Sequence, residues 1–316
     1  MKSILILMVL FFSFDCLAHN WTKVFVPGAK CGDGRDYFIY LDKKSDSKLA
    51  VEFMAGGACW DAATCFGPNL RTWMYPIPEI PNFSTFGADT DDGKHPLVKH
   101  TFIHFPYCTG DVYSAHHIAR YFPGVTVYHQ GYLNVVLAFK YLQENNILKF
   151  QNYKEVVLWG ASAGGIGALV HTKTIEPYLN PKASKMVLSD SPGLHFGQDF
   201  WQKFPPQMLA DFQEAFAKFG LPLDRNSGLV TKYMRNAFLT LWDWKIGVMQ
   251  GTQDIVMSLL FGNETPWEHE RQVMGPDGVR AQAWGLPNVN VWISNTKMHT
   301  FLILPESTEI ENMEGL

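Results

Sequence analysis

The sequence predicts one α/β domain, with a mostly parallel central sheet and helices on both faces. Short apolar runs rich in β-branched and aromatic residues alternate along the chain with segments of helical periodicity. One such run, residues 156–159, passes through a glycine-rich turn directly into a helical pattern. The chain has 316 residues, of which 47% are hydrophobic and 18% charged, so it can bury a sizeable core.

The first 18 residues differ from this pattern. Lys2 gives a positive start, residues 4–14 are apolar, and residues 16–18 are suited to signal-peptidase cleavage. The run is short for a membrane span, so we expect a cleavable signal peptide at 1–18, with an uncleaved anchor as the alternative. The mature chain, residues 19–316, then forms one secreted or periplasmic domain without stable membrane insertion.

Four of the five cysteines lie in the mature chain, an even number that predicts two disulfides in an oxidising compartment. Three pairings are possible. Cys59 and Cys65 bracket a short loop and are the favoured pair, which leaves Cys31 with Cys108. A zinc site is the rival interpretation, but the chain has no C-x-x-C and its histidines are scattered. We therefore expect no metal.

Residues 37–41 and 49–54 predict two strands joined by a polar turn. The second strand runs into Gly56 and Gly57, which free the backbone to turn its N–H groups toward a ligand. In α/β-hydrolases this position supplies half of the oxyanion hole, and an ordinary strand-ending turn is the alternative.

A long loop rich in Pro, Gly, Asn and Asp follows at residues 66–100. Within it residues 89–93 resemble a calcium loop, but His100 stands where such a loop needs glutamate, so we expect a solvated turn. We predict that the adjacent His116 and His117 lie in a loop, because neighbours in a regular element point apart.

Further strands are predicted at residues 102–105, 125–128 and 186–191. An amphipathic helix is predicted at about 132–145, with one apolar stripe that faces the core.

The turn at residues 160–164 reads Gly-Ala-Ser-Ala-Gly and joins a predicted strand to a predicted helix. Ser162 would occupy a strained backbone position there, with its Oγ pointing outward. The helix N-terminus lies where negative charge develops during acyl transfer. The motif alone is weak, since any glycine-rich turn with a serine matches it, but its context predicts the nucleophile turn of an α/β-hydrolase.

From about residue 195 to 245 large apolar residues recur at helical spacing. We expect a helical insertion that packs over the carboxyl edge of the sheet and forms one wall of a substrate pocket. The last clear strand, residues 289–294, leads to His299.

A nucleophilic serine needs a base and an acid that orients the base, in the chain order Ser, Asp or Glu, His. His299 follows the final strand and is the expected base, because residues 268–270 read as a solvated acidic face. Asp254 lies before that strand and is the favoured acid, and Asp190 is its strongest rival. Less favoured acids are Asp243 and Asp277.

Several separated motifs, at residues 56–61, 106–112 and 160–165, occur in order with the late Asp254 and His299. Together they resemble the pectin acetylesterase family, which includes the Notum carboxylesterases that remove a fatty acyl group from a signalling protein. The resemblance runs from about residue 31 to 299 and implies an α/β-hydrolase fold. Its implied catalytic set is Ser162 as nucleophile, Asp254 as acid, His299 as base, and Gly57, Ala58 and Ala163 as oxyanion-hole donors.

The resemblance also implies the disulfides Cys31–Cys108 and Cys59–Cys65, and no cofactor. No cysteine lies near His299, and a tryptophan frequent in the family is replaced by Ala58, which is typical of a bacterial-type member.

The implied activity is a secreted serine carboxylesterase that deacetylates O-acetylated polysaccharide. The alternatives are a short-chain or fatty-acyl esterase of the Notum type and a non-catalytic binding module on the same fold. The net charge of −4 and the absence of a basic cluster argue against nucleic-acid binding. The sequence does not fix an oligomeric state.

Overall fold

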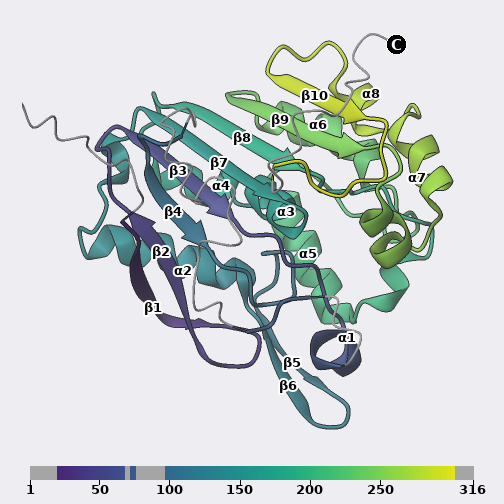
Figure 1. The fold of residues 1–316 in the computed structure, drawn as a ribbon, viewed down its shortest axis with the longest axis horizontal. Coiled ribbons are helices and arrows are strands. Elements are labelled where there is room, and N and C mark those ends of the chain that lie inside the picture. Colours follow the sequence, from purple (N-terminus) through teal and green to yellow (C-terminus); the bar gives the residue numbers. More distant parts are fainter. Residues whose placement is uncertain (1–19, 68–71, 76–96, 303–316) are drawn as a thin grey trace, which may run out of the picture.

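The computed structural model describes residues 20–67, 72–75 and 97–302. Its centre is an eight-stranded sheet in the order β1-β2-β4-β3-β7-β8-β9-β10 (Figure 1). The β1–β2 and β2–β4 pairs are antiparallel, and every pair from β4 to β10 is parallel. The strands are β1 (Thr22–Lys30), β2 (Asp36–Asp42), β3 (Lys48–Phe53), β4 (Thr101–Phe105), β7 (Glu155–Ala161), β8 (Ser184–Asp190), β9 (Trp244–Gly251) and β10 (Val289–Ser294). The predicted α/β class with a mostly parallel sheet is confirmed.

A separate antiparallel hairpin joins β5 (His117–Tyr121) to β6 (Val125–His129). The α-helices are α1 (Ala62–Phe66), α2 (Gly131–Glu144), α3 (Ala163–Val170), α4 (Thr172–Ile175), α5 (Pro206–Lys218), α6 (Met234–Thr240), α7 (Pro266–Val273) and α8 (Val279–Ala283). Short helical turns are η1 (Phe150–Asn152), η2 (Glu176–Tyr178), η3 (Phe200–Lys203), η4 (Val230–Tyr233) and the π-helix η5 (Val256–Gly262).

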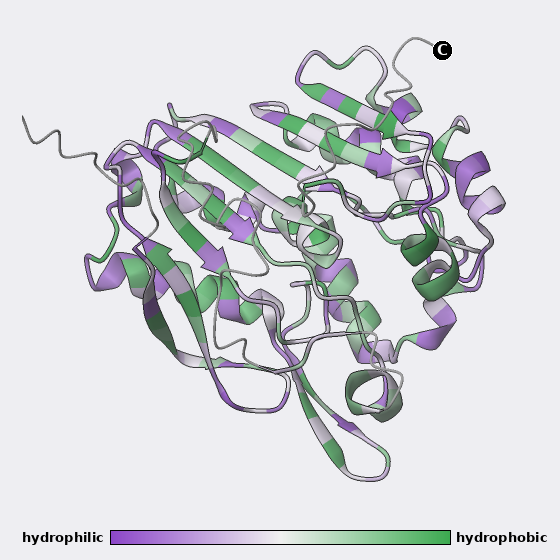
Figure 2. Cartoon of the chain, viewed as in Figure 1, coloured by the Kyte–Doolittle hydropathy of each residue, from purple (hydrophilic) through white to green (hydrophobic). Residues whose placement is uncertain are grey.

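The core lies between the sheet and the helices that cover it. The middle of the central strand β7 is hydrophobic (Figure 2), and every residue of the strand after the first is buried, because both faces of a parallel sheet are covered. Helix α3 packs against β3, β7 and β8 and is buried on every side. Helix α2 turns Val135, Phe139 and Leu142 into the core, as its sequence pattern predicted.

The arrowheads of the parallel strands point toward the side where α1, α5 and α7 gather (Figure 1). Loops that leave the carboxyl ends of the strands therefore meet there, at the edge where open α/β sheets bind ligands. The segments that carry the predicted site residues all leave the sheet at this edge.

Three predictions about local structure were wrong or incomplete. Strand β9 was missed, and Trp244, counted with the helical insertion, begins it. Strand β1 was missed as well, because it is an edge strand with mostly exposed side chains and no long apolar run. His117 is the first residue of β5 rather than a loop residue, since β5 is a short ribbon with a weak strand pattern.

Both expected disulfides, Cys31–Cys108 and Cys59–Cys65, are formed. Within the described ranges, no helix is long and apolar enough to cross a membrane. The predicted signal peptide at 1–18 and the turn at 89–93 lie outside the described residues.

Candidate active site

Ser162 connects the end of β7 to the start of α3. Its backbone has φ 57° and ψ −122°, a positive φ that is strained for any residue with a side chain. Its N–H donates to the carbonyl oxygen of Asp190, 2.8 Å away on the neighbouring strand β8. The turn therefore holds the serine side chain at the carboxyl edge of the sheet, where it lines a pocket.

Glycines make this turn possible. A Cβ placed on Gly160 would lie 2.3 Å from the carbonyl oxygen of Gly164, and one on Gly164 would lie 1.9 Å from the carbonyl oxygen of Phe53. Strand and helix thus approach at backbone-to-backbone distance, as the sequence of the turn predicted.

His299 and Asp254 form a close pair. Nδ1 of His299 lies 2.7 Å from Oδ2 of Asp254, and the carboxylate can only accept, so the ring N–H donates. The other oxygen, Oδ1, accepts from the backbone N–H groups of Val256 and Met257, each at 3.0 Å. Asp254 is fully buried, and these bonds to the first turn of η5 fix the orientation of its carboxylate.

Asp190, the rival acid, does not contact the imidazole. Its Oδ2 accepts from the backbone N–H groups of Phe301 and Leu302, each at 2.7 Å. Burial raises the pKa of this carboxyl, while those hydrogen bonds and the nearby His299 oppose the shift. The two less favoured candidates are elsewhere, since Asp243 pairs with Lys185 and Asp277 is exposed.

The serine and the histidine lie at the same edge of the sheet but form no hydrogen bond with each other in this structure. The His299 side chain keeps 15% of its surface exposed, whereas Ser162 is nearly buried. In many hydrolases the bond between nucleophile and base is long without substrate and shortens in the reactive complex.

The predicted oxyanion-hole residues Gly57, Ala58 and Ala163 line the same pocket as Ser162. Gly57 has φ 78°, a conformation that glycine adopts without strain, and its carbonyl accepts from the Tyr107 hydroxyl at 2.7 Å. Ala163 begins α3, so its N–H has no acceptor within the helix. The N–H of Ala163 therefore lies at the positive end of the α3 dipole.

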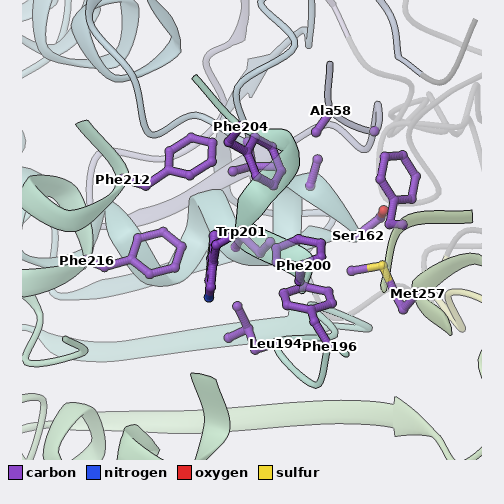
Figure 3. Close-up of a pocket in the computed structure, with 15 residues that line it drawn as sticks. Ala58, Ser162, Leu194, Phe196, Phe200, Trp201, Phe204, Phe212, Phe216 and Met257 are labelled. Carbon is purple, nitrogen blue, oxygen red and sulfur yellow. The ribbon is translucent and has the colours of Figure 1, made fainter. Parts of the chain in front are cut away.

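The pocket beside Ser162 is almost wholly apolar (Figure 3). It encloses about 550 Å³ between its atoms, including open solvent at its mouth. Most of the wall comes from the segment predicted as a helical insertion, and Figure 3 shows its aromatic rings extending to one side of Ser162. These wall residues are Leu194, Phe196, Phe200, Trp201, Phe204, Phe212 and Phe216. Val112, Ile166, Met257 and Phe261 complete the lining.

Several residues at the site were not predicted. Among the described residues, the non-glycine positions with positive φ cluster around it, as strained backbone does at functional sites. Apart from Ser162, whose strain the sequence of the turn predicted, a single sequence carries little signal for them, because none is glycine. They are Val112, Tyr113, Asn146, Ser162, Ser191, Leu194, Asn263 and Thr300, of which only Asn146 is remote from the site segments.

The prediction that residues 268–270 form a solvated face was wrong for its middle residue. His269 is buried, and its Nδ1 lies 2.9 Å from the carbonyl oxygen of Thr252. The three residues lie on α7, where consecutive side chains point in different directions, so Glu268 is exposed while Glu270 is half-buried and accepts from the Gln253 amide at 2.8 Å. Burial lowers the pKa of His269 and keeps its ring neutral.

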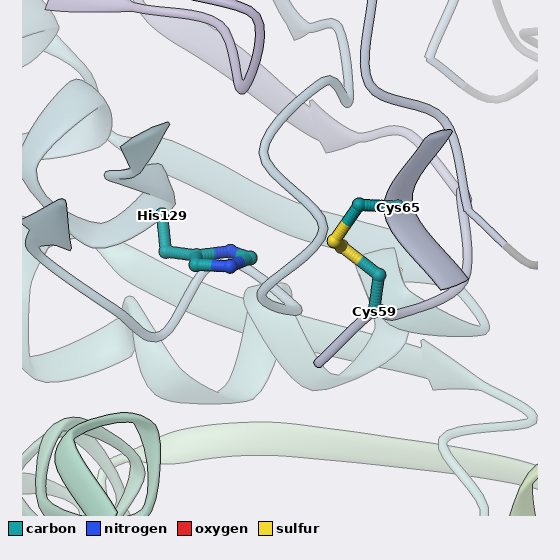
Figure 4. A group of neighbouring side chains, drawn as sticks. All are labelled: Cys59, Cys65 and His129. Carbon is teal, nitrogen blue, oxygen red and sulfur yellow. A yellow bond between two sulfur atoms is a disulfide. The ribbon is translucent and has the colours of Figure 1, made fainter. Parts of the chain in front are cut away.

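One group of three side chains within the described ranges has the composition of a metal site: Cys59, Cys65 and His129 (Figure 4). The two sulfur atoms are bonded to each other, so they offer no thiolate. Nδ1 of His129 lies 2.8 Å from the Thr109 carbonyl oxygen, and Nε2 lies 2.9 Å from the Tyr121 hydroxyl. Burial lowers the pKa of His129 to about 4, so this group is a disulfide beside a neutral histidine.

A protein-family model described as Pectinacetylesterase matches residues 19–203, more than half of the chain. The matched region includes Gly57, Ala58, Ser162 and Ala163 and ends before Asp254 and His299. No relative was found among curated proteins.

Proposed function

Because the chain belongs to the pectinacetylesterase family and is therefore a carboxylic ester hydrolase, we propose that it works as a serine esterase through Ser162, His299 and Asp254. One observation carries the proposal: a buried carboxylate orients His299 at 2.7 Å, at the edge of the sheet where Ser162 occupies a strained turn. An activated serine requires a base oriented in this way, and also a hydrogen bond from its Oγ to Nε2 of that base, which we propose forms in the reactive complex.

In the first step Oγ of Ser162 attacks the carbonyl carbon of the ester, and Nε2 of His299 takes the hydroxyl proton. The tetrahedral intermediate then expels the alcohol, which receives that proton, and an acyl-enzyme remains. Water attacks the acyl-enzyme by the same route and releases the acid. Asp254 keeps Nδ1 protonated and stabilises the imidazolium that forms in each half-reaction.

The N–H groups of Gly57, Ala58 and Ala163 are proposed to bind the developing oxyanion. Their support is their position around Ser162 and the free first turn of α3. Donors of this kind stabilise the transition state rather than the ground state, and loss of one costs about 10² to 10³ in kcat.

The family favours an O-acetyl group on a polysaccharide as the substrate. A specific observation favours a second candidate, an ester with a longer acyl chain. An acetyl group has one methyl to bury, whereas this pocket presents a wall of aromatic rings next to the nucleophile. Each methylene that enters such a wall contributes about 0.8 kcal/mol, or roughly fourfold in affinity.

Hydrolysis of p-nitrophenyl acetate, butyrate, octanoate and palmitate tests both candidates. Ser162→Ala should lower kcat by about 10⁴ to 10⁶ on every ester while the protein stays folded. Highest kcat/KM on acetate supports the polysaccharide deacetylase, and highest kcat/KM on octanoate supports the longer-chain esterase. Near-normal turnover by the Ser162→Ala variant would exclude the serine mechanism.

A pair of variants tests whether the aromatic wall selects the acyl chain. Phe212→Trp fills part of the pocket and should lower octanoate turnover more than acetate turnover. Phe122→Trp is the matched control, because Phe122 is 93% exposed and lies in the β5–β6 turn, away from the pocket lining. Equal losses on both esters would argue against chain binding at this wall.

The proposed setting is the periplasm or the cell exterior. Two disulfides support it, since such bonds persist in oxidising compartments. A non-catalytic binding module on this fold remains the competing proposal, and labelling by a fluorophosphonate separates the two because only an activated serine reacts.

A further inference from the structure

Asp190 occupies a central position in the sheet. It is the last residue of β8 and pairs with Ala161 of β7 on one side and with Met249 of β9 on the other. Its surface is fully buried. Ser162 is the residue that follows Ala161 at the end of β7. Asp254 lies three residues after Gly251, the last residue of β9.

Asp190 is hydrogen-bonded to two segments of the candidate site. Its carbonyl oxygen accepts from the N–H of Ser162 at 2.8 Å. Its Oδ2 accepts from the N–H groups of Phe301 and Leu302, two and three residues after His299, at 2.7 Å each. One side chain and its own backbone thus tie the nucleophile turn to the loop that carries the base.

The neighbouring Ser191 adds a further hydrogen-bonded link between Asp190 and the histidine loop. Oγ of Ser191 donates to Oδ1 of Asp190 at 2.9 Å and accepts from the N–H of Thr300 at 3.1 Å. Three consecutive backbone N–H groups of the histidine loop are therefore bound directly by Asp190 or through its neighbour. Without these acceptors the loop, which includes the strained Thr300, would have no comparable anchor on β8.

Within the described ranges no Lys or Arg forms an ion pair with Asp190, and the ionisable group that favours its charged form is His299. Asp254 and the neutral His269 are the other ionisable groups that face His299. A buried negative charge at this position attracts the imidazolium that the proposed mechanism forms.

We propose that Asp190 is a positioning residue that fixes His299 relative to Ser162 and whose negative charge stabilises the protonated imidazole. The inference rests on the proposed serine mechanism. It assigns two carboxylates to one histidine. Asp254 binds Nδ1 of the ring, whereas Asp190 holds the loop that carries His299 and acts on the ring by electrostatic attraction without contact.

Asp190→Asn separates the charge from the hydrogen bonds. The amide oxygen can still accept from Phe301 and Leu302, and the amide NH₂ can donate to Ser191, so the loop stays anchored. Removing the charge should destabilise the imidazolium that forms at His299 during the proposed reaction. We expect kcat to fall about 3- to 10-fold, KM to stay constant, and the acidic limb of the kcat/KM profile to move down by about 0.5 to 1 pH unit.

Two further variants complete the test. Asp190→Ser removes both the charge and the hydrogen bonds to the loop. It should shift the acidic limb of the kcat/KM profile as much as Asp190→Asn does and lower kcat more. The control Asp277→Asn removes one exposed charge and should change neither kcat nor the position of the acidic limb. All variants are measured on the best p-nitrophenyl ester, with thermal unfolding recorded in parallel.

An unchanged acidic limb in Asp190→Asn would overturn the proposed role of the charge. A loss of activity that follows only the loss of folded protein, or unfolding of both Asp190 variants, would make Asp190 an anchor of the fold and overturn the proposal. Wild-type protein without Ser162-dependent activity would instead refute the serine mechanism, so the two failures are distinguishable.

Discussion

The turn at Ser162 makes a sharp prediction about Gly164, the second of its two glycines and the last residue of the turn. A methyl group at this position would lie 1.9 Å from the carbonyl oxygen of Phe53, 2.7 Å from its carbonyl carbon and 2.9 Å from the carbonyl oxygen of Met54. All three are backbone atoms at the end of β3, so no side chain can rotate away. Gly164→Ala therefore forces α3 and β3 apart.

The size of the effect follows from that distance. A carbon atom in contact with a carbonyl oxygen needs about 3.3 Å, so the helix or the strand must shift by more than about 1 Å. Overpacking costs about 1 to 3 kcal/mol when side chains can adjust, and we expect about 3 kcal/mol or more where only backbone can move. For a domain of about 300 residues that loss lowers Tm by roughly 5 °C.

The same shift should reduce activity beyond the loss of folded protein. β3 leads directly to Gly57 and Ala58, and a displacement of about 1 Å at a catalytic group can cost on the order of 10² in rate. The assay is thermal unfolding together with kcat on the best ester at a temperature where the variant is folded.

Gly247→Ala is the matched control. Gly247 lies in β9, and a methyl group there would meet only the end of the flexible Leu188 side chain, at 2.8 Å. Its Tm should stay within about 2 °C of wild type. If Gly164→Ala changed Tm as little as the control and kept full activity, the close approach of α3 to β3 would not be required, and the argument for the turn would fail.

Three further predictions concern other parts of the molecule. Asp254→Asn should lower kcat by about 10⁴ because the amide favours the wrong tautomer of the histidine, and a loss below tenfold would exclude Asp254 as the acid. Burial raises the pKa of Glu264 to about 8, so the folded protein keeps a proton that the unfolded chain loses and stability falls as pH rises from about 4.5 to 8. Glu264→Gln should therefore gain Tm relative to wild type across that window, and a pH-independent difference would contradict this account. Replacing Cys31 and Cys108 together by serine removes a disulfide with a sequence separation of 77, which should cost about 4.5 kcal/mol in urea unfolding by the chain-entropy model; a cost below about 2 kcal/mol would refute that estimate.

The sequence predicted the features that local chemistry determines. A buried strand followed by Gly-Ala-Ser-Ala-Gly leaves few conformations other than a tight turn into a helix, and the structure has that turn at Ser162. Chain order favoured Asp254 over Asp190 as the partner of His299, and the structure places Asp254 and His299 2.7 Å apart. Their catalytic roles stay a prediction. The short spacing of Cys59 and Cys65 likewise led to the correct pairing.

Features that depend on tertiary packing could not be predicted. Val112, Ser191, Leu194 and Thr300 adopt positive φ although none is glycine, because surrounding contacts hold them there. The π-helix η5 has no sequence signature, yet its first turn binds the buried carboxylate of Asp254. Strands β1 and β9 were missed because their side chains fit no simple alternation.

The choice between the two aspartates shows why position along the chain was an incomplete guide. Both Asp190 and Asp254 are buried at the carboxyl edge, on or just after neighbouring strands β8 and β9. A carboxylate offers about four lone-pair sites, and the local donors that fill them influence which oxygen can orient an imidazole. At Asp190 both oxygens are occupied, Oδ2 by two loop N–H groups and Oδ1 by the Ser191 hydroxyl.

At Asp254 the backbone of η5 occupies Oδ1, which leaves Oδ2 directed at His299. The amide of Gln250 approaches the same oxygen only at 3.5 Å, too far to compete with the imidazole. The distribution of donors thus separates two chemically identical side chains: one orients the ring, and the other holds the loop on which the ring is carried. A change that moved the Val256 and Met257 N–H groups of η5 away from Asp254 should therefore weaken the orientation of the His299 ring, although neither group contacts that ring.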